Sequence, residues 1–336
     1  MSIEISAKTI QPVRLSYGNL KERFGDKKPA SRYQEAVYDV QPTTNFQYLP
    51  IWDTKHELYD KSKTAIVMED WYSFADPRQY YYGTYTIARS KQQDVAEHNF
   101  AFVDKRDLFD SVPEEVKQAA REILVPLRHV EWAANMNNCQ ITDECFGSNF
   151  STLAMFNAMD RLGMAQYVTR LGLLLDGNEE TSLDAGKQAW MEAPEWQGLR
   201  HAIEDMFVLD DWFELMVAQN FVLDGLVFPL LYDRFEKKLT TEGGATIAML
   251  TEFMDDWYKE TVRWTNALAK VTAKESEANQ ELLSKWTNKW TDRLVGALEP
   301  VAAKAFGADG IEQLTEVKEA LLTRLTKSGV TGLKRS

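Results

Sequence analysis

Histidine and glutamate are the residues that a di-iron carboxylate centre requires, and their spacing along this chain tests for one. A helical bundle builds such a centre from single glutamates on two helices and a Glu-x-x-His pair on each of two others. The chain has four histidines, which are His56, His98, His129 and His201. The residues three positions before them are, in the same order, Asp53, Val95, Pro126 and Gly198. None is a glutamate, and carboxylates alone rarely assemble such a redox site, so we expect no working di-iron centre in this chain.

Other arrangements that carry chemistry are also missing from the sequence. Asp53 and His56 are three residues apart, but they lie in a proline-rich stretch, where helical spacing does not bring them together. The chain has no GxSxG elbow, no GxxxxGK[ST] phosphate loop and no GxGxxG turn. Adjacent acids such as Asp210-Asp211 and Asp255-Asp256 point in different directions on a helix, so we interpret them as solvated faces or ion pairs.

Composition limits the classes of partner. The 336 residues carry a formal charge of −13, which repels nucleic acid and anionic membranes over most of the surface. The opening MSIEISAKTI lacks the features of a signal peptide, and no run reaches the roughly 18 apolar residues of a membrane span. We therefore expect a cytoplasmic protein. Cys139 and Cys145 fit neither a metal-thiolate nor a CxxC pattern, so we interpret them as reduced thiols.

The first 75 residues differ from the rest because they are rich in proline and aromatic residues and show no sustained helical period. A segment of this length is too long for a structureless loop in a compact domain. We expect an extended arm that lies in a groove, either on its own chain or on a partner; a set of short strands packed on the same chain is the alternative. The aromatic residues predicted to contact a partner are Tyr17, Phe24, Tyr33, Tyr38, Phe46, Tyr48, Trp52 and Trp71.

From residue 76 onward the apolar spacing predicts helices almost without a break. Asp76 and Pro77 are typical of an N-cap and first helical residue, and they predict a helix to about residue 102. A capping-box pattern at 111–114 predicts a helix to about residue 137, which Pro126 should kink. A third helix should cover 148–175 and end at Asp176-Gly177.

The second half of the chain continues this pattern. A short helix should follow Pro194, and the stretch 212–231 is apolar nearly all round, so it should be central. After the Gly243-Gly244 break, further helices are predicted at 247–268, at 273–304 and at 311–325. The prediction from this pattern is a large all-α bundle of long helices with an extended N-terminal arm. We divide the chain into an arm (1–75), a metal-free bundle (76–305) and a short C-terminal helix with a tail (306–336).

Several long segments resemble a known family, in the same order along the chain. They are FGDKKPASRYQEAVYDV (24–40), MEDWYSFADPRQYYYGTY (68–85), VPLRHVEWAANMNN (125–138), MDRLGMAQY (159–167), DDWFELMVAQNFVLDG (210–225) and LTEFMDDWYKETVRWTNA (250–267). These segments resemble the β subunit of bacterial multicomponent phenol hydroxylases, and the resemblance spans nearly the whole chain. Toluene and methane monooxygenases have related subunits. The RFGDKKPASRYQEA stretch is most similar to the phenol branch.

The resemblance implies a ferritin-like fold and a role as the middle subunit of an α2β2γ2 hydroxylase. In the large subunit of such enzymes a helix carries Glu-x-x-His with an arginine before the histidine. Here the equivalent stretch is Pro126 to His129, with proline in place of the glutamate. A second equivalent stretch is Glu252 to Asp255, with aspartate in place of the histidine. These four positions are interpreted as degenerate ligand positions, and no catalytic, cofactor or metal residue is expected here.

The resemblance also implies the surrounding system. The di-iron centre would lie in the catalytic α subunit, which hydroxylates an aromatic ring with O2. A reductase with FAD and an iron-sulfur cluster would supply electrons from NADH, and a small effector protein would complete the system. This chain would brace and dimerise the catalytic subunit. Two rivals are an autonomous di-iron oxidase with an unusual carboxylate site, which bound iron would favour, and a free helical scaffold, which a stable monomer would favour.

Overall fold

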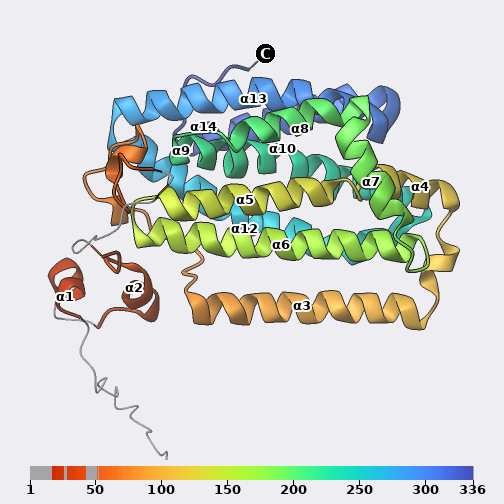
Figure 1. The fold of residues 1–336 in the computed structure, drawn as a ribbon, viewed down its shortest axis with the longest axis horizontal. Coiled ribbons are helices and arrows are strands. Elements are labelled where there is room, and N and C mark those ends of the chain that lie inside the picture. The colour runs from red at the N-terminus through yellow and green to blue at the C-terminus, as the bar shows by residue number, and fades with distance from the viewer. Residues whose placement is uncertain (1–16, 26–28, 43–50, 52, 336) are drawn as a thin grey trace, which may run out of the picture.

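The computed structural model describes residues 17–25, 29–42, 51 and 53–335, and within these ranges it is built from helices, turns and irregular connections without strands. Long helices lie side by side in a bundle, and the two short N-terminal helices lie beyond one end of it (Figure 1). This confirms the all-α, ferritin-like prediction. The described residues of the arm (1–75) form short helices and irregular segments. They do not form the short strands that were the alternative to an extended arm.

The helices before the centre of the chain are α1 (Gly18–Phe24), α2 (Arg32–Val37), α3 (Tyr82–Lys105), α4 (Glu114–Ile123), α5 (Leu127–Glu144), α6 (Ser148–Leu175), α7 (Thr181–Glu192) and α8 (Pro194–Met206). The later α-helices are α9 (Trp212–Met216), α10 (Asp224–Val227), α11 (Phe235–Leu239), α12 (Ala245–Glu275), α13 (Glu277–Phe306) and α14 (Gly310–Lys327).

The segment from Trp212 to Gly244 alternates between α and π turns and is kinked at Gly243. The π turns cover 217–223, 228–234 and 240–244, between α9, α10 and α11. Pro229 lies in the second of them. A proline lacks the N–H that an α-helical turn needs, and a local π turn is one way for a helix to continue past it. The segment then turns into α12 at Gly243, whose φ of 96° is in the left-handed region that glycine tolerates.

Two predicted boundaries were wrong, and one helix was missed. Asp76 does not cap a helix; it is buried, its side chain pairs with Arg78 in the loop, and α3 begins only at Tyr82. The single helix predicted across Pro126 is two helices, because α4 ends at Ile123 and Pro126 stands at the start of α5. A proline is tolerated there because the first N–H groups of a helix have no intrahelical partner. Helix α7 was not predicted.

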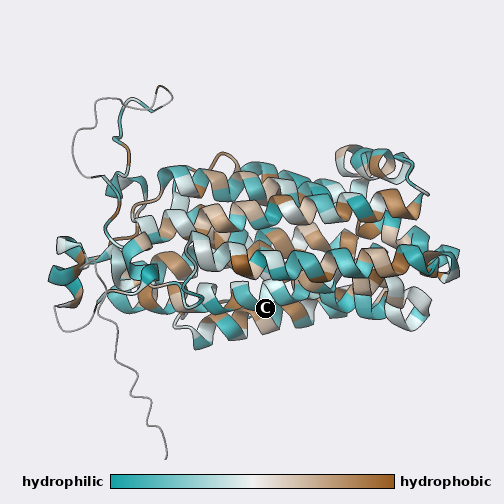
Figure 2. Cartoon of the chain, turned by 90° about the horizontal axis from the view of Figure 1, so that it is seen from below, coloured by the Kyte–Doolittle hydropathy of each residue, from teal (hydrophilic) through white to brown (hydrophobic). Residues whose placement is uncertain are grey.

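One continuous core runs through the bundle and reaches from Ile66 to Val330. Apolar and polar residues are interleaved along the helices, as Figure 2 shows. The most apolar helical stretch, Trp212–Glu275, is long enough to cross a membrane, but the qualifying window is 94% buried inside this protein. Its apolar side chains therefore form the centre of the core, as predicted for 212–231. Helix α14 packs on α13 and adds Leu314, Val317 and Leu321 to the same core.

Candidate functional site

Four helices of the bundle each direct one residue into its centre. Glu131 comes from α5, Arg161 from α6, Asp224 from α10 and Trp257 from α12. None of the four side chains is more than about 1% exposed. In a di-iron bundle the metal ligands likewise project inward from facing helices. This cluster of four residues is the central cluster.

The Arg161 guanidinium joins the two carboxylates of the central cluster. Its Nε lies 2.5 Å from Glu131 Oε2, and its Nη1 donates to Asp224 Oδ1 at 2.9 Å. Tyr232 donates its hydroxyl to Glu131 Oε1 at 3.1 Å, and the Gln219 amide donates to Asp224 at 2.9 Å. The guanidinium also lies 5.2 Å from the centre of the Trp257 ring, within cation–π distance. The two carboxylates and the Trp257 ring therefore all contact the Arg161 guanidinium.

Burial dominates the electrostatics of the central cluster. Desolvation raises the pKa of Glu131 to about 7, even though the charge of Arg161 opposes that rise. Desolvation also raises the pKa of Asp224, again against the effect of Arg161. Burial pulls down the pKa of Arg161, but the carboxylates of Asp224 and Glu131 outweigh it and raise this pKa above its ordinary value. Arg161 therefore stays charged, and burial favours the protonated form of Glu131.

These residues do not fit a di-iron centre. The cation between the two carboxylates is a guanidinium, which has only N–H donors and no lone pair to offer a metal. The tryptophan on α12 offers no ligand either. No group of three or more histidine, cysteine, aspartate or glutamate side chains with the geometry of a metal site occurs among the described residues. The cation that lies between the two carboxylates in this structure is Arg161.

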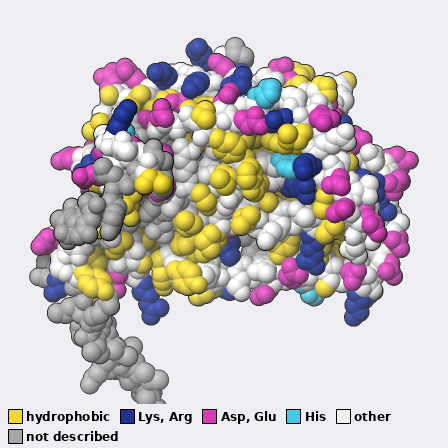
Figure 3. All heavy atoms as spheres, in the orientation of Figure 1, with side chains coloured by type: hydrophobic (Ala, Val, Ile, Leu, Met, Phe, Trp, Pro, Cys, Tyr) yellow, Lys and Arg dark blue, Asp and Glu magenta, His cyan; other side chains and the backbone are white. Residues whose placement is uncertain are grey.

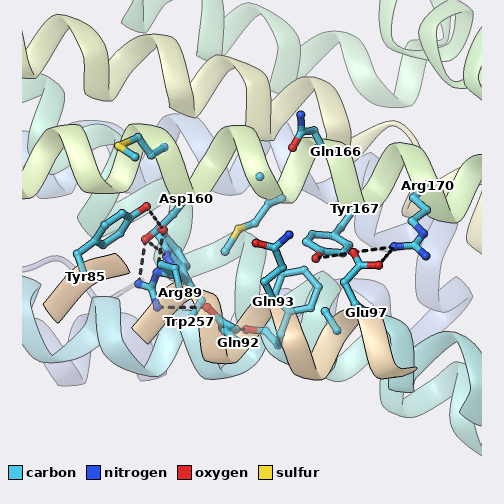
Figure 4. Close-up of a pocket in the computed structure, with 15 residues that line it drawn as sticks. Tyr85, Arg89, Gln92, Gln93, Glu97, Asp160, Gln166, Tyr167, Arg170 and Trp257 are labelled. Atoms are coloured by element: carbon cyan, nitrogen blue, oxygen red, sulfur yellow. Dashed lines mark hydrogen bonds and ion pairs between the residues drawn. The ribbon is translucent and has the colours of Figure 1, made fainter. Parts of the chain in front are cut away.

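A second polar cluster lies next to the first and reaches the surface. Asp160 precedes Arg161 on α6 and accepts hydrogen bonds from Trp257 Nε1 at 2.7 Å and from the Tyr85 hydroxyl at 2.8 Å. Arg89 of α3 binds both Asp160 oxygens, at 2.8 and 2.9 Å, and also pairs with Glu260. Figure 4 shows these side chains converging from α3, α6 and α12. Trp257 therefore touches both clusters.

The positions interpreted as degenerate ligands lie elsewhere. His129 stacks on Trp190 of α7 with ring centres 5.7 Å apart. Desolvation, with help from the charge of Arg128, lowers the pKa of His129 to about 4. Glu252 and Asp255 line a shallow surface cleft with Tyr232 and Glu236. Pro126 begins α5 and makes no contact with that cleft. The structure thus does not bring the four predicted positions together.

The aromatic residues of the arm fall into three groups. Tyr33 and Tyr38 are buried in a small cluster with Leu20, Val37 and Tyr72, and Trp71 is buried in the main core beside Trp212. This corrects the expectation for Tyr33, Tyr38 and Trp71, because their rings pack within the chain itself. Tyr17 and Phe24 are exposed, at 52% and 39%. Phe46, Tyr48 and Trp52 lie outside the described residues.

Sequence reasoning missed Glu131, Asp160, Arg161 and Asp224. Each is a charged residue set among apolar residues at the core spacing of its helix, as in NFVLDG at 220–225. Charged side chains are almost never fully buried unless they are paired. A charge at a predicted core position therefore indicates a partner on a facing helix, and that signal would have found the central cluster.

Comparison with known proteins shows which family this chain belongs to. A family model described as methane/phenol/alkene hydroxylase matches residues 52–276. The chain belongs to this family. It is 50% identical, over 98% of both chains, to the phenol 2-monooxygenase oxygenase component DmpL of Pseudomonas sp. (strain CF600). It is 23% identical to the hydroxylase β subunit of the toluene-4-monooxygenase system of Ectopseudomonas mendocina, over 78% of this chain and 82% of that one.

A solved structure has the same fold over the whole chain. The phenol hydroxylase of Pseudomonas sp. OX1 superposes with a TM-score of 0.90 at 46% identity and covers 97% of this chain and 98% of that one. The prediction from sequence that this chain resembles a phenol hydroxylase β subunit is confirmed. The chain is thus related to oxygenase components of multicomponent hydroxylases and to the β subunit of a toluene monooxygenase.

Proposed function

We propose that this chain is the non-catalytic structural β subunit of an aromatic monooxygenase that hydroxylates phenol. It would brace and dimerise a catalytic α subunit whose di-iron centre uses O2 and electrons derived from NADH. The observation that supports the proposal is Arg161, which lies as a cation between Glu131 and Asp224 in the centre of the bundle. The 50% identity over 98% of a phenol 2-monooxygenase component supports a place for this chain in a phenol-oxidising complex.

An exposed apolar face supports a role in assembly. Trp132 and Met136 of α5 and Met155 and Leu162 of α6 are between 40% and 51% exposed. Hydrophobic side chains gather over these helices in the middle of the face shown in Figure 3. Large contiguous apolar patches on a soluble protein mark interaction sites. We assign this face to contact with the catalytic subunit.

The remaining parts of the system follow from the same proposal. The hydroxylase would be an α2β2γ2 assembly, served by an effector protein and by a reductase with FAD and an iron-sulfur cluster. The arm (1–75) would add partner contacts through exposed residues such as Tyr17 and Phe24. The complex would act in the cytoplasm, and neither nucleic acid nor a membrane would be a partner. This chain would bind no cofactor of its own.

Iron content tests the non-catalytic role. The catalytic subunit and this chain would be co-expressed in iron-replete medium, and the purified complex would be analysed for iron and protein. We expect about two irons for each pair of one catalytic subunit and one copy of this chain, because only one bundle of the pair has ligands. About four irons per pair would show that this chain holds its own centre and would favour the autonomous oxidase.

A surface substitution tests the assembly face. Leu162→Asp puts a charge into the middle of the apolar face, and burying an unpaired charge at an interface is unfavourable. We expect it to reduce recovery of the catalytic subunit with this chain. Ile311→Asp is the matched control, because Ile311 is also exposed, at 51%, but lies on α14. Equal recovery with both variants would place the contact with the catalytic subunit elsewhere.

A further inference from the structure

A cavity of about 340 Å³ lies between α3, α6 and α12, on the outer side of the Asp160 cluster. Two polar bridges from α3 to α6 close its ends. At one end Tyr85 and Arg89 bind Asp160, and at the other Glu97 pairs with Arg170 at 2.8 Å and accepts from Tyr167 at 3.1 Å. Figure 4 shows the two bridges on either side of Gln93. Helix α3 is thus held away from α6 by its side chains.

The floor of this cavity includes a glycine that the chain itself does not require. Gly163 lies inside α6, where glycine is about 1 kcal/mol less favourable than alanine. A Cβ built on Gly163 meets nothing within 4 Å, and its φ is not in the left-handed region. Neither packing within the described chain nor backbone conformation therefore calls for glycine. A molecule that approaches the helix backbone from the cavity would account for it.

The lining defines the chemistry of such a molecule. Every charged side chain that lines the cavity is already paired, since Arg89 binds Asp160 and Glu260, and Arg170 binds Glu97. A charged ligand would find no free partner among them. The apolar part of the wall consists of Met159, Met164, Phe253 and the rings of Tyr167 and Trp257.

Two features of the wall suit a flat ring with a single polar group. Tyr167 and Phe253 meet edge to face with ring centres 4.9 Å apart, and methionine sulfur packs well on aromatic rings. The amides of Gln93 and Gln166 line the cavity and form no hydrogen bond with another described residue. In Figure 4 Gln93 projects into the space between α3 and α6. An amide can donate to or accept from a neutral hydroxyl group.

We propose that this cavity is a binding site for a small neutral aromatic alcohol, with phenol as the simplest member of the class. The ring would lie against Gly163 between Met159 and Phe253, and the hydroxyl would bind the amide of Gln93. The choice of a phenol as ligand rests on the proposed function, whereas the cavity and its neutral lining do not.

Titration of the full-length chain with phenol tests the site. Binding would be measured by calorimetry and by saturation-transfer NMR at pH 7, where phenol is neutral, with benzoate as a charged probe of similar size. We expect saturable binding of one phenol per chain and none of benzoate. Gly163→Leu places a side chain in the cavity and should weaken phenol binding at least roughly tenfold, the effect of an ill-fitting group in a small pocket.

Gly296→Leu is the matched control. Gly296 is likewise inside a helix, α13, with nothing within 4 Å of an added Cβ, but it does not line the cavity. This variant should bind phenol as the parent chain does. Gln93→Met keeps the length of the side chain and removes the amide, so it should weaken binding of phenol and leave binding of toluene unchanged.

Four outcomes would overturn the proposal. The first three are no saturable binding of phenol, equal binding of benzoate, and equal binding by the two glycine variants. The fourth is a combined result, in which the parent chain binds no phenol and the Gly163→Leu variant no longer binds the catalytic subunit. The last would show that a protein side chain fills the cavity. Iron content and subunit recovery are measured separately, so phenol binding can fail while the proposed function stands, and the reverse.

Discussion

Replacement of Arg161 by methionine should destabilise the protein strongly. Methionine keeps an unbranched side chain of similar reach but removes the charge and all five N–H donors. Glu131 and Asp224 would then face each other in the core, both at most 1% exposed, without a cation. Removing one partner of a buried ion pair costs about 3–5 kcal/mol. Since proteins are stable by only about 5–15 kcal/mol, the loss should be plain in the midpoint of urea unfolding followed by circular dichroism.

The pH dependence distinguishes this cause from a simple packing defect. Glu131 has a pKa of about 7 in the folded protein against an ordinary 4.5, so the folded state binds more protons than the unfolded state between these values. The free energy of unfolding contributed by this group therefore falls as pH rises from 4.5 to 7. Without Arg161 the pKa of Glu131 rises further, and the loss should be smaller at pH 5 than at pH 8.

A triple variant provides the control. Arg161→Met combined with Glu131→Gln and Asp224→Asn removes all three charges and should recover most of the lost stability, because neutral replacement of a whole buried cluster is often tolerated. A loss below about 1 kcal/mol at pH 8 for Arg161→Met alone would show that the carboxylates need no cation. An equal loss at pH 5 and pH 8 would show that the defect is one of packing.

Two further predictions concern single groups near the clusters. Trp257→Phe removes the indole N–H that donates to buried Asp160. It should therefore lower the free energy of unfolding by about 1–3 kcal/mol more than Trp264→Phe, because the Trp264 indole N–H has no hydrogen-bond partner in the described structure. Equal losses of stability in thermal unfolding would contradict this. His129 has a pKa of about 4 when folded and an ordinary 6.5, so its contribution to stability is complete above pH 6.5 and is lost as pH falls toward 4. His129→Gln should flatten unfolding midpoints across that window, and an unchanged slope would refute the role of His129.

Local signals determined most of the fold. Helix α6 was predicted from 148 to 175 and has these bounds, because glycines stand on both sides of it, at Gly147 and Gly177. The boundary at Asp76 was wrong because the Asp76 carboxylate forms an ion pair with Arg78 in the loop. An Asp-Pro pattern alone does not predict this contact. Helix α7 has only a weak apolar stripe, since its buried residues are Ser182, Leu183, Gly186 and Trp190. Contacts with α6 and α8 stabilise this helix.

The residues predicted from the sequence as ligand positions lie on the same helices as the buried cluster, but on other faces of those helices. His129 and Glu131 are two residues apart on α5, and Asp255 and Trp257 are two residues apart on α12. Two residues correspond to about 200° around an α-helix, so each pair points to opposite faces. Matching Glu-x-x-His in order selected His129 and Asp255, which face α7 and the surface cleft. The inward residues are the other member of each pair.

The central cluster also explains how a bundle of this kind stays together without metal ligands. Carboxylates from α5 and α10 would repel each other in a dry core, so a cation must lie between them. In a di-iron bundle that cation is the metal. Here it is Arg161, which is part of α6 and is always protonated. Because Arg161 is covalently part of α6, the three helices are joined in every folded molecule without a bound ion, as the proposed bracing role would require.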